Sequence, residues 1–269
     1  MKIIKNVLDL NKAIKDFKNF GFVPTMGGIH KGHISLIKNS QKKCKKTIVS
    51  IFVNPTQFND KNDFKKYPRN LNHDITILKK HKIDYLFIPS IKDIYNKKNS
   101  KFKLKKKDKI LCAKTRKGHF EGVLNVMNRL LSLIKVKYVF MGEKDYQQLF
   151  LIKKYLNKKK IIIVQCPTIR DKNNIALSTR NNLLNKKNYK KATLIINYLL
   201  KLKKKLIKNK NKLTISLKQI IKYLENYYDI KIDYLEFRNE KNLNISNLKG
   251  KYRLFVAYHI NKVRLIDNF

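Results

Sequence analysis

Two histidines, His30 and His33, follow a glycine-rich turn that begins after Pro24. An apolar run leads into the turn, so the pattern predicts a strand, a tight turn and the start of a helix. Backbone N–H groups at such a junction can bind nucleotide phosphates, and imidazoles beside them can donate to phosphate oxygens as charge develops. Gly27, Gly28 and Gly32 would allow close approach. The alternative interpretation is a plain turn with two surface histidines.

Asn54 and Gln57 follow the next apolar run of the chain. If that run is a strand of a parallel sheet, both amides leave it at the edge where ligands bind. Neutral amides are suited to hydroxyls and carboxylates, and they add no charge to the site. Considered alone, this segment is equally compatible with an ordinary turn.

Charged and amide side chains also gather after the apolar run at 138–141. Lys144 can pair with phosphates, Asp145 can accept from a hydroxyl or orient Lys144, and Gln148 lies one helical turn on. A lysine in the first turn of a helix opposes the helix dipole, which favours anion binding. The alternative is a capped helix with an internal ion pair.

A fourth group, Ser178, Thr179 and Arg180, places two hydroxyls beside a guanidinium. This arrangement is typical of a phosphate-binding loop, and a loop near a domain boundary could close over a nucleotide. A helix N-cap with an arginine facing solvent is the alternative.

The elements that must position these groups follow from hydrophobic periodicity. Strands are predicted at 2–4, 22–25, 47–53, 85–88, 138–141 and 161–165, with helices at 9–20, 33–45, 71–81, 122–134 and 144–156. Asp9 is the expected N-cap of the first helix. The alternation predicts an α/β fold, a Rossmann-like parallel sheet flanked by helices.

The pattern changes after about residue 170. Helices are predicted at 183–208 and 214–227, followed by strands at 233–237, 253–259 and 263–266. Helices followed by neighbouring strands indicate a smaller C-terminal α+β domain with an antiparallel sheet. We therefore expect a nucleotide- and substrate-binding domain at 1–170 and a small domain at 171–269. The lysine-rich segment 97–109 is expected to be a solvated loop or edge strand.

The formal charge of +45 raises the possibility of a nucleic-acid-binding module. The lysines are spread along the whole chain together with many Asn and Ile residues, as in proteins from AT-rich genomes, so we expect no nucleic-acid partner. Three cysteines without close pairing indicate reduced buried thiols. Without an apolar run of membrane-spanning length, and with charges near residue 1, we expect no membrane association and a cytoplasmic location.

Several segments, in order, resemble the pantothenate synthetase (pantoate–β-alanine ligase) family of the H-x-G-H nucleotidyltransferase-like group. They are 23–33, 54–58, 67–69, 118–123, 142–149 and 177–181. The resemblance spans about residues 20–185; the remaining residues fit the family's small domain less distinctively.

The resemblance implies ATP-dependent condensation of pantoate with β-alanine to pantothenate, AMP and pyrophosphate through a pantoyl-adenylate. His33 would be the general acid, and Gln57 and Gln148, with Asn54 nearby, would bind pantoate and β-alanine. The implied ATP-binding residues are Met26, Gly27, Gly28, Ile29, His30, Lys31, Gly32, His33, Gly142, Glu143, Lys144, Asp145, Ile169, Leu177, Ser178, Thr179 and Arg180. Mg²⁺ would be carried by ATP and not by protein ligands. The small domain would act as a lid, and the family habit is a homodimer.

This sequence departs from the family pattern at three positions. Lys31 stands where an acidic residue is frequent, Thr179 replaces the usual second serine, and Arg129 stands where lysine is common. None of these removes a required group. A related nucleotidyltransferase acting on a phosphorylated acceptor is the alternative enzyme, although the paired amides Gln57 and Gln148 favour an acceptor without phosphate.

Overall fold

The chain divides by its internal contacts into two compact units, Met1–Thr168 and Ile169–Phe269. The structure, a computed structural model, describes residues 1–15, 19–59, 64–65, 67–95, 102–156, 161–208, 216–246 and 250–269. Each unit is described by itself.

The first unit is built on a six-stranded parallel sheet in the order β1-β4-β3-β2-β5-β6. The strands are β1 Lys2–Ile4, β2 Phe20–Thr25, β3 Lys46–Ile51, β4 Tyr85–Phe87, β5 Tyr138–Gly142 and β6 Ile162–Cys166. Strand β2 lies between β3 and β5, so the loops after these three strands leave one edge of the sheet side by side. The predicted parallel α/β fold is confirmed.

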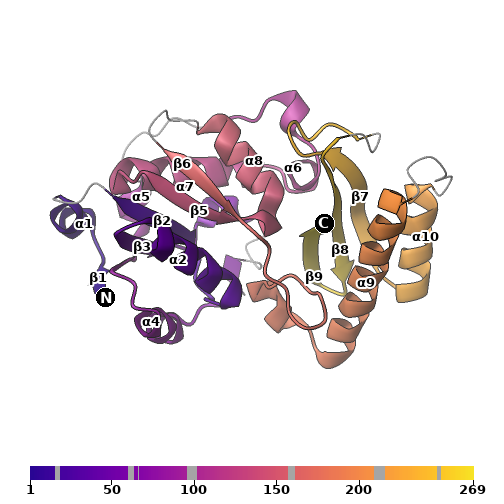
Figure 1. Cartoon of the computed structure of the whole chain (residues 1–269), viewed down its shortest axis with the longest axis horizontal. Helices are drawn as coiled ribbons and strands as arrows, with labels where there is room; N and C mark the ends of the chain where they lie inside the picture. The colour runs from indigo at the N-terminus through magenta and orange to yellow at the C-terminus, as the bar shows by residue number, and fades with distance from the viewer. Residues whose placement is uncertain are drawn as a thin grey trace. The chain divides into compact units, whose positions relative to one another are not determined.

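Helices flank this sheet on both sides (Figure 1). They are α1 Val7–Ile14, α2 Lys31–Lys43, α4 Leu71–Lys80, α5 Ile91–Tyr95, α6 Cys112–Thr115, α7 His119–Ile134 and α8 Tyr146–Tyr155, with 3₁₀ turns η1 Pro55–Gln57, η2 Lys106–Asp108 and η3 Glu143–Asp145. Helices α2 and α4 share a buried apolar cluster with the sheet, to which Ile37, Val49, Leu78 and Phe140 belong. Burial of that apolar surface is the main force that holds the layers together.

Two local predictions need correction, and a third is confirmed in one of its alternatives. The first helix begins at Val7, and its N-cap is Asn6 instead of Asp9, because the Asn6 side chain accepts from the Asp9 N–H at 2.8 Å. The helix does not extend to residue 20, which belongs to β2, and 16–18 lie outside the described residues. The helix expected from 144 is a 3₁₀ turn followed by α8. For the segment 97–109 the loop alternative is found: residues 102–109 form a loop with η2, whereas 97–101 lie outside the described part of the chain.

The second unit consists of η4 Thr179–Leu183, α9 Lys186–Lys208, α10 Leu217–Tyr228 and a three-stranded antiparallel sheet. Its strands are β7 Lys231–Asn239, β8 Tyr252–Ile260 and β9 Val263–Asn268, in that order. The helices lie beside one another against the sheet (Figure 1), and both contribute to one apolar core. The predicted small α+β unit is confirmed. The predicted helix start at 214 falls outside the described residues, and Ser216 caps α10.

The three cysteines, Cys44, Cys112 and Cys166, are free and buried, as predicted. Among the described helices, none is long and apolar enough to cross a membrane.

Gly21 in β2 allows α2 to approach the sheet. A Cβ at this position would lie 2.1 Å from Ser40 Oγ and 2.9 Å from the Phe140 ring. We predict that Gly21→Ala lowers the free energy of unfolding by about 1–3 kcal/mol, the usual cost of overpacking. Urea denaturation measures this. Gly142→Ala is the matched control, because its Cβ would meet nothing within 4 Å; equal stability of the two variants would contradict the prediction.

Candidate functional site

The turn after β2 requires glycine. Gly27 and Gly28 have φ values of +83° and +64°, in the left-handed region that side chains disfavour. The Thr25 hydroxyl donates to the Ser50 carbonyl at 2.7 Å and accepts from the Gly27 N–H at 3.2 Å. The start of the turn is therefore fastened to the neighbouring strand β3.

Asp74 of α4 completes the turn, and sequence reasoning missed it. Its carboxylate, 2% exposed, accepts from the Gly28 N–H at 2.8 Å and from the Ile29 N–H at 2.7 Å. Two charge-assisted hydrogen bonds to consecutive backbone donors define the conformation of the turn. No local pattern indicates this role, because Asp74 lies on a helix far along the chain.

The two histidines form the start of α2 in an unusual way. His30 is the N-cap, and its Nδ1 accepts from the Gly32 N–H at 3.1 Å, while His33 Nδ1 accepts from the His30 N–H at 3.4 Å. The ring centroids are 4.1 Å apart. Because each Nδ1 is an acceptor, the hydrogen-bond network assigns the proton of each neutral ring to Nε2.

These contacts change the expected role of the backbone. The N–H groups of Gly27, Gly28, Ile29, His30 and Gly32 all have acceptors inside the protein. The sequence suggested that N–H groups of this turn would meet a phosphate. The structure instead uses them to set the positions of the imidazoles, whose Nε2–H groups remain as donors.

Burial, together with nearby charges, lowers the pKa of both rings, so both are neutral near neutral pH. The pKa of His30 is lowered from 6.5 to about 4, chiefly by burial and then by the charge of Lys144, against an opposing effect of Asp145. The pKa of His33 is lowered to about 3, chiefly by burial and then by His30. Lys144 and Asp145 thus lie close enough to act on the histidine pair, as the sheet order requires.

Gln57 is buried beside the same turn. Its Nε2 donates to Met26 Sδ at 2.9 Å, and its Oε1 accepts from Asn54 Nδ2 at 3.2 Å. Asn54, 1% exposed, also donates to the Gly122 carbonyl and accepts from Thr56 and from the Tyr95 hydroxyl. Asn54 therefore holds Gln57 in place through contacts with protein groups.

Helix α7 also helps to hold Asn54 and Gln57 in place. His119 Nδ1 donates to the Gln57 carbonyl at 2.7 Å, since its Nε2 faces the Arg116 guanidinium, which can only donate. A Cβ on Gly122 would lie 2.4 Å from the Thr56 carbonyl oxygen, so only glycine allows α7 to approach η1. These contacts explain the segment 118–123, to which the sequence assigned no individual role.

Lys144 and Asp145 are side by side in η3, with 3.1 Å between Nζ and Oδ1. On α8, the two neighbouring glutamines differ. Gln147 is buried and its amide bonds to the Cys112 N–H and the Ile110 carbonyl, whereas the amide of the partly exposed Gln148 bonds to no described residue. Of the pair, Gln148 is the one whose amide is available to a ligand. Glu143 accepts from Gln165.

The remaining predicted site residues lie in the second unit. Ile169 and Leu177 face each other across a short hairpin, where the Leu177 N–H donates to the Ile169 carbonyl at 3.0 Å. Ser178 is the N-cap of η4, its hydroxyl accepting from the Arg180 N–H at 3.3 Å, and Thr179 is buried.

Comparison with known proteins identifies the family. The family model described as pantoate-beta-alanine ligase matches residues 2–269. The chain belongs to the pantoate-beta-alanine ligase family. A relative in Pseudothermotoga lettingae, called pantothenate synthetase, is 38% identical over 276 residues, covering 100% of this chain and 98% of its own.

Solved structures of ligases in this family agree. The pantothenate synthetase of Thermus thermophilus has a TM-score of 0.92 at 30% identity, covering 100% of this chain and 99% of its own. The pantoate-beta-alanine ligase of Francisella tularensis, solved with a β-γ ATP compound and β-alanine, has a TM-score of 0.84 at 38% identity, covering 100% and 97%.

The low pKa values of the histidine pair can be tested directly. We predict that the ring ¹⁵N shifts of His30 and His33 in the ligand-free protein keep the pattern of a neutral Nε2–H ring from pH 8 to about pH 5.5, because their pKa values are about 4 and 3. An NMR titration measures this. A midpoint near 6.5 for either ring would contradict it. Because the unfolded chain takes up these protons first, stability falls as pH drops from 6.5 toward 4.

Asp74→Asn tests the support of the turn. The substitution keeps the size of the side chain, but its NH₂ group cannot accept from a backbone N–H. We predict that the free energy of unfolding falls by about 2–3 kcal/mol, since hydrogen bonds to charged groups contribute about 1.5–3 kcal/mol. Urea denaturation provides the value. The control is Asp9→Asn on the exposed face of α1, which should change stability by less than about 0.5 kcal/mol. Similar losses for both variants would contradict the assignment.

Proposed function

We propose that this protein condenses pantoate with β-alanine to pantothenate, using ATP, which becomes AMP and pyrophosphate. The observation that carries the proposal is the family match over residues 2–269. The solved relative from Francisella tularensis holds a β-γ ATP compound and β-alanine, which supports the same substrates here. The local geometry supports the proposal independently. Lys144 is close enough to act on the neutral imidazoles of His30 and His33, and the turn that carries them also contacts the neutral amide of Gln57 through Met26.

In the first step, a carboxylate oxygen of pantoate attacks the α-phosphorus of ATP and pyrophosphate leaves, giving pantoyl-adenylate. Negative charge grows on the phosphate oxygens during this step. The Nε2–H groups of His30 and His33 donate to these oxygens, and Lys144 adds a positive charge. Because the rings are fixed by the helix start before substrate binds, little reorganisation is needed in the transition state.

The role of His33 as a general acid is limited by its protonation state. A pKa of about 3 means that the ring in the free protein holds a single proton at neutral pH. A bound polyphosphate would favour the charged ring and raise this pKa. We therefore propose that His33 acts chiefly as a hydrogen-bond donor to the leaving pyrophosphate, and that proton transfer from it depends on ATP being bound.

In the second step, the neutral β-alanine amine attacks the acyl carbon of the adenylate. The C–N bond forms, the bond between the acyl carbon and the phosphate oxygen breaks, AMP leaves, and the amine proton is released to water. Gln57 and Gln148 are proposed to bind pantoate through neutral amides, so that the carboxylate keeps its nucleophilicity instead of being paired with a cation. Asn54 acts by holding Gln57. Both steps depend on positioning and on charge stabilisation, and no protein side chain forms a covalent bond with the substrate.

The other expectations stay part of the proposal. ATP contacts also come from Met26–His33, Gly142–Asp145, Ile169 and Leu177–Arg180, and the second unit acts as a lid. Mg²⁺ would be bound by the ATP phosphates and would neutralise part of their charge. The half-exposed carboxylate of Asp145, next to Lys144, is an acidic group that fits such a metal–phosphate complex. A homodimer and a cytoplasmic location remain predictions from the sequence and family resemblance.

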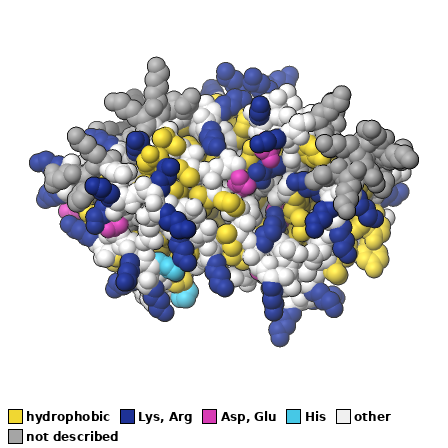
Figure 2. All heavy atoms as spheres, in the orientation of Figure 1, with side chains coloured by type: hydrophobic (Ala, Val, Ile, Leu, Met, Phe, Trp, Pro, Cys, Tyr) yellow, Lys and Arg dark blue, Asp and Glu magenta, His cyan; other side chains and the backbone are white. Residues whose placement is uncertain are grey.

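Two alternatives predict different behaviour. A nucleotidyltransferase with a phosphorylated acceptor calls for arginines directed at the acceptor, whereas the groups bonded to the Gln57 side chain here are Asn54 and Met26. The nearby Arg116 donates to the Gln57 main-chain carbonyl at 3.4 Å and also faces His119. A nucleic-acid-binding module calls for basic residues gathered on one element. Figure 2 shows Lys and Arg side chains at many separate places on the coloured part of the visible face. The face shown therefore favours the ligase over nucleic-acid binding.

An assay of pyrophosphate release tests the function. With ATP, Mg²⁺ and pantoate we expect a burst of about one pyrophosphate per enzyme as the adenylate accumulates, and continuous turnover when β-alanine is added. Absence of pantoate-dependent release would contradict the proposal. Release stimulated by a phosphorylated acceptor such as a phosphopantetheine-type substrate instead would support the alternative enzyme.

His33→Ala tests the mechanism in the same assay. Loss of a donor to the developing charge should lower the rate of adenylate formation by at least about 100-fold. The matched control is His81→Ala at the end of α4, outside the site, which should retain the wild-type rate. A wild-type rate for His33→Ala would remove His33 from the mechanism, and urea denaturation of both variants checks that the fold is intact.

A further inference from the structure

One guanidinium joins two distant segments of the second unit. Arg170 lies at the start of the hairpin between Ile169 and Leu177, and Asp267 lies in β9. Arg170 donates from Nη1 to Asp267 Oδ2 at 2.7 Å and from Nη2 to Oδ1 at 2.9 Å. Asp267 is 5% exposed, so this two-fold pairing is largely removed from water. Bidentate pairs of this kind restrict both distance and orientation.

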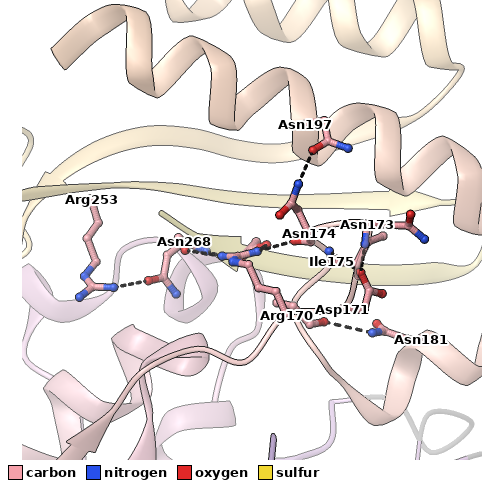
Figure 3. A network of polar contacts seen from close by, with 11 residues as sticks. Arg170, Asp171, Asn173, Asn174, Ile175, Asn181, Asn197, Arg253 and Asn268 are labelled. Carbon is pink, nitrogen blue, oxygen red and sulfur yellow. Dashed lines mark hydrogen bonds and ion pairs between the residues drawn. The ribbon is translucent and has the colours of Figure 1, made fainter. Parts of the chain in front are cut away.

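The Arg170 guanidinium has further partners both in the hairpin and at the end of β9. It donates to the Asn174 carbonyl at 2.9 Å, on the far side of the hairpin, and to the Asn268 carbonyl at 3.1 Å. Its centre lies 5.0 Å from the Phe269 ring. Figure 3 shows Arg170 between the hairpin and Asn268, with the hairpin residues around it. The arginine therefore fastens the whole hairpin to the end of β9.

The hairpin has its own internal support. Asp171 Oδ1 accepts from the Asn173 N–H at 2.8 Å and the Ile175 N–H at 3.0 Å, and the Tyr189 hydroxyl of α9 donates to Oδ2. Asn174 adopts a φ of +68° at the tip. The internal bonds define the shape of the hairpin, whereas the Arg170 contacts with β9 define where it lies relative to the small sheet.

The residues on either side of the hairpin are those proposed to contact ATP. Ile169 immediately precedes Arg170, and Leu177 leads directly into Ser178 and η4. Their backbones are bonded to each other, so a shift of the hairpin moves them together. The side chain of Arg170 is committed to Asp267, Asn268 and Asn174, and hence its effect on a nucleotide is indirect.

We propose that Arg170 and Asp267 are positioning residues for ATP: their buried ion pair sets the place of Ile169 and of Leu177–Arg180. The inference rests on the proposed function, because it takes these residues as ATP contacts. It assigns a functional role to β9, which carries no proposed substrate contact. Weakening the pair should weaken ATP binding and leave the affinity for pantoate unchanged.

Asp267→Asn is the first test, since it keeps the size of the side chain and removes the charge. We expect the KM for ATP, and the Kd for a non-hydrolysable ATP analogue measured by calorimetry, to rise by about 10-fold or more, while the KM for pantoate stays within about twofold. Arg170→Lys keeps the charge but loses the fork, so it should raise the same ATP constants by a smaller factor.

Asp233→Asn is the matched control. Asp233 lies in β7 of the same sheet and accepts from Arg264 Nε at 2.8 Å and from His259. Neither of these partners belongs to the hairpin. It should destabilise the unit to urea as Asp267→Asn does and leave the ATP constants at wild type. Equal changes in ATP affinity for the two variants, or none for Asp267→Asn, would overturn the inference.

Failure of the inference and failure of the proposed function give different results. If wild-type protein turns over pantoate but Asp267→Asn binds the ATP analogue as tightly as wild type, the inference is wrong and the function stands. If wild-type protein binds the ATP analogue but shows no pantoate-dependent turnover, the function is wrong. Should Asp267→Asn fail to fold, Arg170→Lys carries the same comparison with Asp233→Asn.

Discussion

The buried carboxylate of Asp74 accepts hydrogen bonds from two backbone N–H groups of the turn, and this interaction determines the geometry of the site in the first unit. Glycine can adopt the positive φ angles of the turn, but it can adopt many others as well, so a further interaction must select one conformation. Asp74 provides it. Once the turn is set, His30 falls at the N-cap of α2 and His33 falls three residues later on the same face.

The histidine pair shows how secondary structure can control chemistry. Capping contacts at the start of α2 occupy Nδ1 of both rings, and burial lowers both pKa values well below neutrality. The result is two fixed, neutral Nε2–H donors beside Lys144. A high net charge of the whole protein does not achieve this, because exposed charges are screened by salt over about 10 Å, whereas desolvation acts directly on the buried ring.

Buried protein groups set the position of Gln57. Asn54 bonds to its side chain and His119 to its carbonyl. Gly122 allows α7 to come close enough for His119 to reach Gln57 and for Asn54 to donate to the Gly122 carbonyl. Asn54 and His119 are buried and hydrogen-bonded, as precise positioning of a neutral side chain requires. In the second unit, the Arg170–Asp267 pair gives comparable support to the hairpin. In both units the proposed site residues therefore lie on loops that buried polar contacts hold in place.

Hydrophobic periodicity and local motifs determined the order of strands and helices along the chain, the parallel and antiparallel sheets, and the junctions that carry His30, Gln57, Lys144 and Ser178. These features are local or periodic, so the sequence displays them. Tertiary structure alone decided that Asp74 holds the turn, that Gln147 is internal while Gln148 is available, and that Arg170 pairs with Asp267. Such contacts join residues far apart in the chain, and no local pattern encodes a distance in space.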